Sequence, residues 1–82
     1  MKRIEVIARG NYSHKETSIR AAVNTNKSGK QYLEINARQL RSAADRVCYS
    51  GTDYLRIATV EGYGDFEAYE DGRDYGQRAF KI

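Results

Sequence analysis

One histidine and one cysteine are the side chains of this chain best suited to proton transfer or nucleophilic attack. General acid–base catalysis usually needs a histidine or a carboxylate pair in a cleft, whereas His14 lies in a polar stretch. A cysteine nucleophile needs a base beside it, and Cys48 lies at the end of a predicted helix, next to its apolar stripe. A single cysteine and a single histidine are too few for a structural zinc site. The sequence therefore predicts no catalytic residue, no metal site and no cofactor.

Tyrosines and arginines on the predicted strands could instead form a binding surface. Tyr32, Tyr54 and Tyr69 are each placed on a strand, and Arg20 and Arg56 share their outward-facing parity. If those strands are neighbours, this face can stack nucleic-acid bases or contact phosphates. It can equally form a protein interface, because Tyr and Arg are frequent at interface hot spots. Cross-strand pairing of tyrosines that covers an open sheet face explains the same pattern without a partner.

A second basic surface is predicted on the helix. Arg38 and Arg41 are three residues apart and share a face. Together with Lys27 and Lys30 from the preceding turn, they could form a patch that meets phosphates or an acidic protein surface. Arginines that are simply solvated on the helix surface are the alternative.

The elements that must position these residues follow from periodicity and turn signals. Alternating apolar residues predict strands over residues 3–9, 17–23 and 31–35. Two more, over 54–60 and 66–70, are expected to pair across the glycine-containing stretch 61–64, and a short last strand is expected over 77–82. The predicted fold class is α+β, in the order β-β-β-α-β-β, with five or six antiparallel strands and one α-helix packed on one face.

The helix is predicted from an N-cap residue, a row of apolar residues at helical spacing, and a glycine after its last turn. Asn36 is a suitable N-cap, and Gly51 can adopt a left-handed conformation soon after the last turn. The buried stripe is expected at helical spacing, through Ala37, Leu40, Ala44 and Val47. These residues are small, so the helix should lie close to the sheet.

Composition limits the class of protein. The 82 residues suffice for a single domain over 1–82, and the charge is asymmetric: residues 1–41 carry nine Lys and Arg against three Glu, whereas 42–82 carry five against eight Asp and Glu. No apolar run is long enough to span a bilayer, and the basic N-terminus lacks the apolar region of a signal peptide. One cysteine fits a reducing cytoplasm. The expectation is a cytoplasmic monomer or weak dimer.

Residues 36–73 resemble a family of phage anti-CRISPR proteins whose known members inhibit type I-F surveillance complexes. The resemblance is carried by residues 48–52 (CYSGT), 56–62 (RIATVEG) and 68–73 (AYEDGR), with a length difference of one residue before Arg56. It covers about half the chain. It implies a small sheet-plus-helix protein without enzymatic activity, which docks on the repeated subunits that hold the guide RNA and blocks hybridisation of target DNA.

The same resemblance implies which residues make the contacts. Basic side chains on the helix and near the last turn bind the partner in this family, and Arg41 and Arg73 match them. Asp45 and Asp74 stand where the family has basic residues, so a related scaffold with a changed docking surface is implied.

Three functions are therefore predicted from the sequence. The first is an anti-CRISPR protein that binds subunits of a type I surveillance complex in the host bacterial cytoplasm. The second is a stand-alone module that binds DNA or RNA through the sheet face or the basic helix. The third is an assembly protein that pairs through an exposed edge strand.

Overall fold

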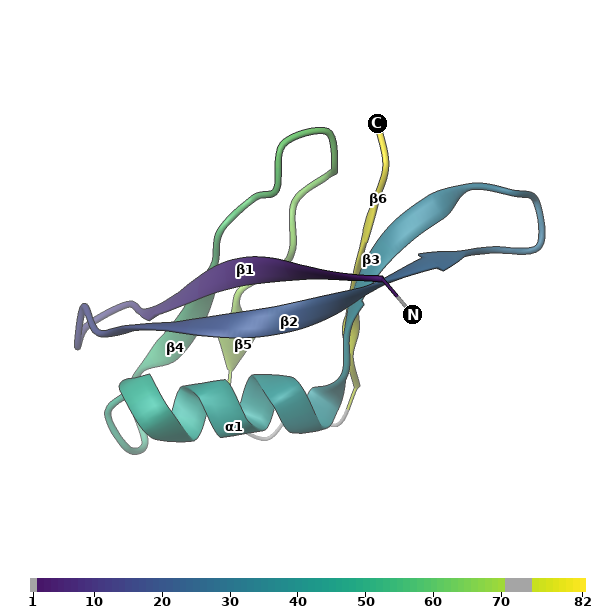
Figure 1. Ribbon diagram of the computed structural model, residues 1–82. Helices are drawn as coiled ribbons and strands as arrows, with labels where there is room; N and C mark the ends of the chain where they lie inside the picture. Colours follow the sequence, from purple (N-terminus) through teal and green to yellow (C-terminus); the bar gives the residue numbers. More distant parts are fainter. Residues whose placement is uncertain (1, 71–74) are drawn as a thin grey trace.

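A computed structural model describes residues 2–70 and 75–82 of the chain. The elements, in chain order, are β1 (Arg3–Gly10), β2 (Glu16–Thr25), β3 (Gln31–Ile35), α1 (Ala37–Val47), β4 (Tyr54–Ile57), β5 (Tyr69–Glu70) and β6 (Gln77–Phe80). The strands form one antiparallel sheet in the order β5-β4-β1-β2-β3-β6, and α1 lies on one face (Figure 1). The predicted α+β fold is confirmed.

The strands form where apolar and polar residues alternate. Val6 and Ala8 on β1 and Ile19 and Ala21 on β2 are buried, and the register pairs Val6 with Ile19. Directly paired residues share a face, so this register places all four on the helix side of the sheet. The core lies between that face and α1. The described part of the chain contains no helix with the length and apolar character needed to cross a bilayer.

The helix begins and ends where the sequence predicts. Asn36 caps it by accepting from the backbone N–H of Gln39, and Gly51 adopts a φ of +88° in the turn beyond the last residue. The buried face is slightly rotated from the predicted stripe. Leu40 and Val47 are buried as expected, but the third fully buried position is Ala43 rather than Ala44.

The predicted hairpin between residues 54 and 70 is shorter than expected. β4 and β5 pair only at Tyr54–Glu70 and Leu55–Tyr69, instead of over 54–60 and 66–70. Beyond Ile57 a turn forms, in which the Tyr63 N–H donates to the Val60 carbonyl, and Gly62 takes a φ of +87°. The segment that follows the turn then leaves β5, because its backbone finds other partners.

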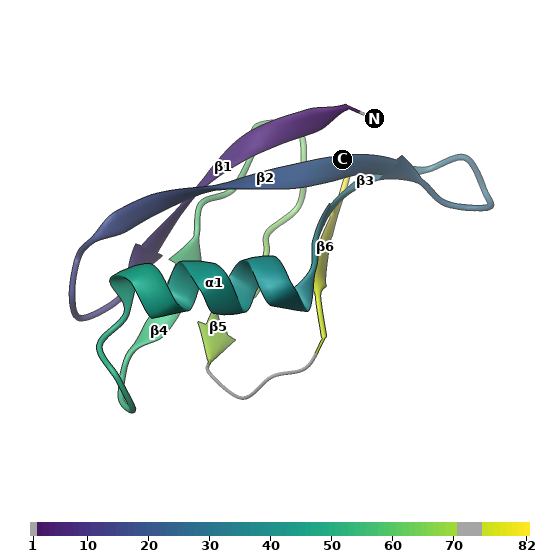
Figure 2. The same cartoon turned by 60° about the horizontal axis from the view of Figure 1, so that its bottom comes forward.

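Those partners lie on β6, at the opposite end of the strand order. The Gly64 N–H donates to the Phe80 carbonyl at 2.8 Å, the Ile82 N–H donates to the Gly62 carbonyl at 2.9 Å, and Tyr63 forms a bridge with Lys81. The sheet therefore curls, with β1 and β2 crossing in front of β4 and β5 in Figure 1. Figure 2 shows α1 lying across one end of this curl. Phe66, from the connecting segment, is buried in the core.

Candidate interaction surfaces

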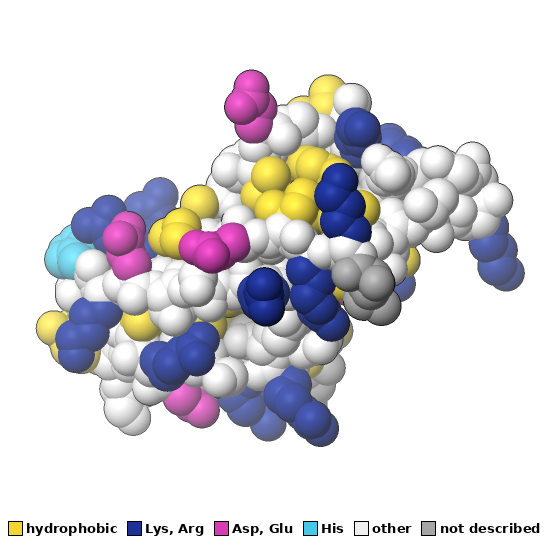
Figure 3. Space-filling model, in the orientation of Figure 1, with side chains coloured by type: hydrophobic (Ala, Val, Ile, Leu, Met, Phe, Trp, Pro, Cys, Tyr) yellow, Lys and Arg dark blue, Asp and Glu magenta, His cyan; other side chains and the backbone are white. Residues whose placement is uncertain are grey.

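The basic groove is a hollow of about 340 Å³ between β2 and α1. Three arginines line it together with polar side chains: Arg20, Arg38, Arg46, Ser18, Ser42 and Gln39. No carboxylate is among its lining residues. Figure 3 shows dark-blue Lys and Arg side chains gathered over β2 and α1.

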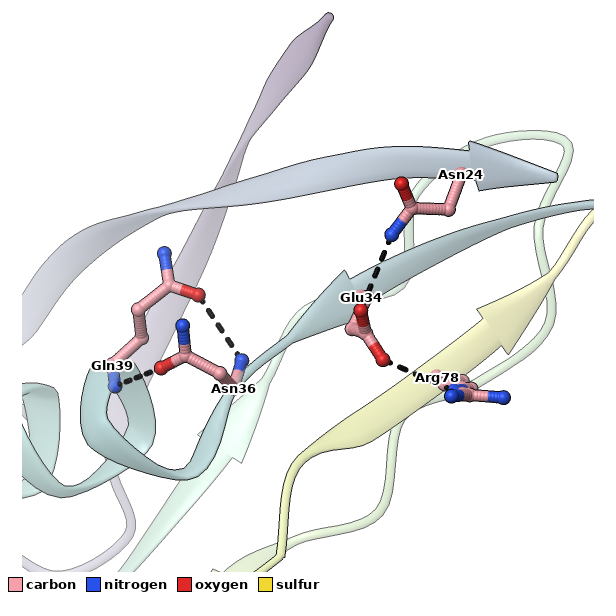
Figure 4. A network of polar contacts seen from close by, with 5 residues as sticks. All are labelled: Asn24, Glu34, Asn36, Gln39 and Arg78. Carbon is pink, nitrogen blue, oxygen red and sulfur yellow. Dashed lines mark hydrogen bonds and ion pairs between the residues drawn. The ribbon is translucent and has the colours of Figure 1, made fainter. Parts of the chain in front are cut away.

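Pairing between strands leaves room for this groove. β3 pairs with residues 22–25 of β2 and then turns directly into α1, so the helix lies along the first half of β2 where a further strand would otherwise pair. Gln39 joins the two elements, because its Nε2 donates to the Arg20 carbonyl at 2.8 Å. The same side chain completes a capping box, in which its Oε1 accepts from the Asn36 N–H at 3.1 Å (Figure 4).

The three arginines of the basic groove are available to a partner. All are exposed, and within the described chain their guanidinium groups make no hydrogen bond or ion pair. Arg38 and Arg46 are two helical turns apart, so they lie on the same side of α1. Guanidinium groups bind carboxylates and phosphates through pairs of parallel hydrogen bonds, and the two serines add hydroxyl donors. The groove is therefore suited to an anionic surface.

An aromatic pair occupies the other face of the sheet, between β3 and β6. The rings of Tyr32 and Phe80 are 5.2 Å apart, with the Arg78 guanidinium 4.8 Å from the Tyr32 centroid and the Lys30 ammonium 5.6 Å from the Phe80 centroid. Glu34 holds Arg78 in place through a 3.1 Å ion pair (Figure 4). Because these cations and rings already satisfy each other, the pair acts mainly as a cover for this part of the sheet.

Asp53 organises the loops at the other end of the molecule. Its carboxylate accepts from four backbone N–H groups, those of Tyr12, Ser13, Tyr49 and Tyr54, at 2.8–3.2 Å. Partial desolvation raises the pKa of Asp53, but the four hydrogen bonds to the charged form together outweigh it and leave the pKa lowered. The carboxylate therefore ties the β1–β2 turn to the segment that follows α1.

Two of the predicted tyrosines are not accessible. Tyr69 was expected to face outward, but it pairs with the inward-facing Leu55, so both side chains are fully buried. Tyr32 does face outward, opposite Phe80, but it is only 8% exposed because Phe80 and Arg78 cover it. The expected exposure of these two rings is therefore not observed, because Tyr69 is fully buried and Tyr32 is nearly so.

The remaining tyrosine and arginine positions do not form one surface. Tyr54 and Arg56 lie on β4, which β1 and β2 separate from Tyr32 on β3. Tyr54 is half-buried and packs edge-on against Tyr12, whereas Arg56 is exposed. The continuous Tyr/Arg face expected from parity is therefore wrong, because the strand order separates its members.

The helix arginines are exposed, but their expected neighbours are not beside them. Arg38 lines the basic groove and Arg41 is exposed on α1 outside it. The β2–β3 turn that carries Lys27 projects away from α1 in both ribbon views. Lys30 lies over Phe80, so the predicted patch of lysines and helix arginines does not form. Arg73 and Asp74 lie outside the described residues.

Cys48 and His14 are the two residues considered for catalysis, and they lie in different segments of the fold. Cys48 is half-buried against the core, and His14 is exposed in the β1–β2 turn, where it accepts a hydrogen bond from Arg9. Across residues 2–70 and 75–82, no three side chains of the metal-binding types lie together.

Sequence reasoning missed two residues that matter here. Arg46 belongs to the basic groove, and its spacing of eight from Arg38 was a usable signal. Asp53 had only a weak local signal, because two of its four partners lie about 40 positions earlier in the chain.

Comparison of the chain with protein-family models, with curated proteins and with solved structures finds no match.

Proposed function

We propose that this protein is an anti-CRISPR protein, which binds a type I CRISPR surveillance complex stoichiometrically and blocks its binding to target DNA. The observation that carries the proposal is the basic groove, where Arg20, Arg38 and Arg46 surround one hollow without a carboxylate among its lining residues. The resemblance of residues 36–73 to inhibitors of type I-F complexes narrows the class of partner. The site of action is then the bacterial cytoplasm.

The charge of the groove supports a docking role. Like charges held together repel each other, and an anionic partner removes that repulsion when it binds. Charge complementarity of this kind raises association rates and selects among partners. Subunits that hold a guide RNA offer phosphates together with the acidic side chains of a protein surface. The groove and the exposed Arg41 lie on or beside α1, so this helix presents most of the contacts.

The experiment is a pull-down of purified type I complexes, type I-F among them, with the protein, followed by a target-DNA binding assay. The wild-type protein should co-purify and abolish DNA binding. Arg46→Glu and Arg41→Glu should each weaken both effects, because a repulsive charge replaces an attractive one. Lys27→Glu makes the same charge change on the β2–β3 turn, outside the groove, and should behave like the wild type. If no complex forms and DNA binding is unaffected, the proposal is wrong.

A second candidate is a nucleic-acid-binding module that uses the same groove. The observation that favours it is the pairing of Ser18 and Ser42 with three arginines, because hydroxyl and guanidinium groups are common phosphate ligands. Binding of this kind weakens steeply with salt, and each phosphate contact contributes about 0.9 to the logarithmic slope for B-DNA. Tight, salt-dependent binding of naked DNA or RNA, lost in Arg46→Glu, would favour the module. Absence of binding at low salt would exclude it.

A further inference from the structure

A second basic cleft lies beside the β1–β2 turn, on the face of the sheet that is turned away from α1. Its volume is about 530 Å³, within the range of small-ligand pockets. The polar side chains among its lining come from β1, the turn, β2, β4 and the segment after β4: Arg9, Asn11, His14, Glu16, Arg56 and Thr59. Nothing in the proposed function uses this cleft.

Two arginines of the cleft are direct cross-strand neighbours. The register pairs Arg9 on β1 with Arg56 on β4, and like charges in directly opposite positions destabilise a sheet. Within the described residues, the guanidinium of Arg56 makes no hydrogen bond or ion pair. Glu16 is paired with Arg9 from the other side, but no ion pair joins them. Among the described residues, Arg56 is thus left without a contact that compensates its charge.

His14 brings a third donor to the same place. Nη2 of Arg9 lies 3.1 Å from Nδ1 of His14, and a guanidinium can only donate. Nδ1 is therefore the acceptor, and the ring carries its proton on Nε2. That proton is left to donate to a ligand. In Figure 3 the cyan histidine lies beside dark-blue side chains at one end of the molecule.

The backbone at His14 is held in an uncommon conformation. Its φ is +60°, in the left-handed region that few non-glycine residues adopt, although His, Asn and Asp do so more often than the rest. His14 and the residue before it are anchored, because the His14 N–H donates to the Gly10 carbonyl at 3.0 Å and Asp53 accepts from the Ser13 N–H. These hydrogen bonds hold His14 in place in the turn beside the cleft.

We propose that this cleft binds a phosphate group, held by the guanidinium groups of Arg9 and Arg56 and by the Nε2–H of His14. Arginine pairs with phosphate oxygens through two parallel hydrogen bonds, and an anion between Arg9 and Arg56 turns their repulsion into attraction. Glu16 is the one carboxylate in the lining, and it lowers the affinity for an anion. The phosphate is carried either by a small molecule or by a nucleic-acid chain.

The test is an NMR titration of ¹⁵N-labelled protein with sodium phosphate, at an ionic strength kept constant with sodium chloride. The amides of Arg9, His14 and Arg56 should shift and saturate. Arg56→Gln should weaken binding about tenfold or more, the loss expected for a charge-assisted hydrogen bond. Arg3→Gln is the matched control. Arg3 is an outward-facing arginine on β1, the strand of Arg9, but it does not line the cleft, so this variant should bind like the wild type.

A stability measurement on Arg56→Gln and two further variants separate binding from folding and from bulk charge. Arg56→Gln should melt no lower than the wild type in phosphate-free buffer, because a cross-strand repulsion is removed. His14→Asn keeps a side chain that tolerates positive φ, but it loses the Nε2 donor and should weaken binding. Glu16→Gln should tighten binding, because it removes the opposing charge.

Parallel titrations distinguish the source of the phosphate. Saturation with a nucleoside monophosphate indicates a small ligand, whereas saturation only with a short single-stranded oligonucleotide indicates a phosphodiester. Absence of saturable shifts with all three probes would overturn the proposal, and so would equal affinities of Arg56→Gln and the wild type. Neither result bears on the basic groove, which the pull-down tests separately.

Discussion

The carboxylate of Asp53 accepts a 2.8 Å hydrogen bond from the backbone N–H of Tyr12, which lies 41 positions earlier in the chain. The same carboxylate reaches the segment after α1 through the N–H of Tyr49. Ser13 adds a second link, because its hydroxyl donates to the carbonyl of Val47 at the end of α1. The β1–β2 turn, the helix end and the start of β4 are thus held together at one point.

Replacing Asp53 with Asn should destabilise the protein at neutral pH. The amide nitrogen would face the N–H groups of Ser13 and Tyr49, which lose their acceptor. Because the folded-state pKa of Asp53 is lowered from 3.8, its contribution to stability is fully present above that value and is lost as pH falls through the folded pKa. The difference in melting temperature between wild type and variant should therefore shrink in acid.

The control for this measurement is Asp65→Asn. Asp65 is exposed and accepts one hydrogen bond, from the Thr59 hydroxyl, which an amide oxygen can also accept. The melting temperature of Asp65→Asn should equal that of the wild type at every pH. If the difference in melting temperature between wild type and Asp53→Asn stays constant from neutral to strongly acidic pH, the stabilising role of the ionised Asp53 carboxylate is wrong.

Gly10→Ala should destabilise the fold by about 1–3 kcal/mol, the cost of overpacking. A Cβ at Gly10 would overlap the Ser13 hydroxyl and come within 2.8 Å of the Val47 carbonyl oxygen, which breaks the link between turn and helix. Gly64→Ala is the control, because its Cβ would meet only the Phe80 carbonyl oxygen at an ordinary 3.6 Å. Urea unfolding of both variants measures the difference, and equal midpoints would refute the close approach at Gly10.

Leu40→Ala should destabilise the protein by about 2–5 kcal/mol. Leu40 is fully buried on the face of α1 that meets the sheet, so truncation leaves a cavity in the core. Ser42→Ala on the exposed side of the same helix should change stability by only about 0.5 kcal/mol. Chemical denaturation monitored by far-UV circular dichroism measures both. A loss below about 1 kcal/mol for Leu40→Ala would mean that α1 packs less tightly than described.

Arg38→Glu should separate partner binding from stability. It reverses a charge in the basic groove, so the pull-down should weaken. The first turn of α1 carries no acidic residue, and a glutamate there interacts favourably with the helix dipole, by about 0.3–1 kcal/mol. Thermal unfolding should show a variant that is as stable as the wild type or slightly more so. Unchanged partner binding would contradict the role of Arg38 in the groove, and reduced stability would contradict the expected interaction of the new glutamate with the helix dipole.

The protein should be a monomer or a weak dimer in solution. The contacts of residues 62–64 with residues 80–82 satisfy backbone groups that an open sheet would offer to another chain. Light scattering over a dilution series measures the mass. A stable dimer at micromolar concentration would favour the assembly function predicted from an exposed edge.

Local signals in the sequence predicted the local structure well. Asn36 needs only the N–H of Gln39, three residues away, to cap the helix, and Gly51 reveals a left-handed turn by its residue type alone. The alternation of apolar residues was equally local, since a strand with one covered face shows it along its own length. These features establish the α+β class without knowledge of strand order.

The candidate site could not be predicted in the same way, because it depends on pairing between distant segments. Tyr69 was placed on the wrong face because its orientation follows from its pairing with Leu55, which a single strand does not reveal. Arg20 and Arg46 line the same groove only because α1 lies along β2. Tyr32 faces outward as expected, and its burial depends on Phe80, nearly 50 positions later.

The closure of the curled sheet also affects how the chain folds during synthesis. β3 pairs with β6, and the segment after β4 completes its hydrogen bonds on residues 80–82. The central strands and α1 can assemble earlier, but the core stays open on one side until residues 77–82 are available to pair. Until then, the edge of β3 is exposed to other nascent chains. Slower translation of residues 77–82 should therefore increase aggregation through β3, because it lengthens the time for which this edge is unpaired.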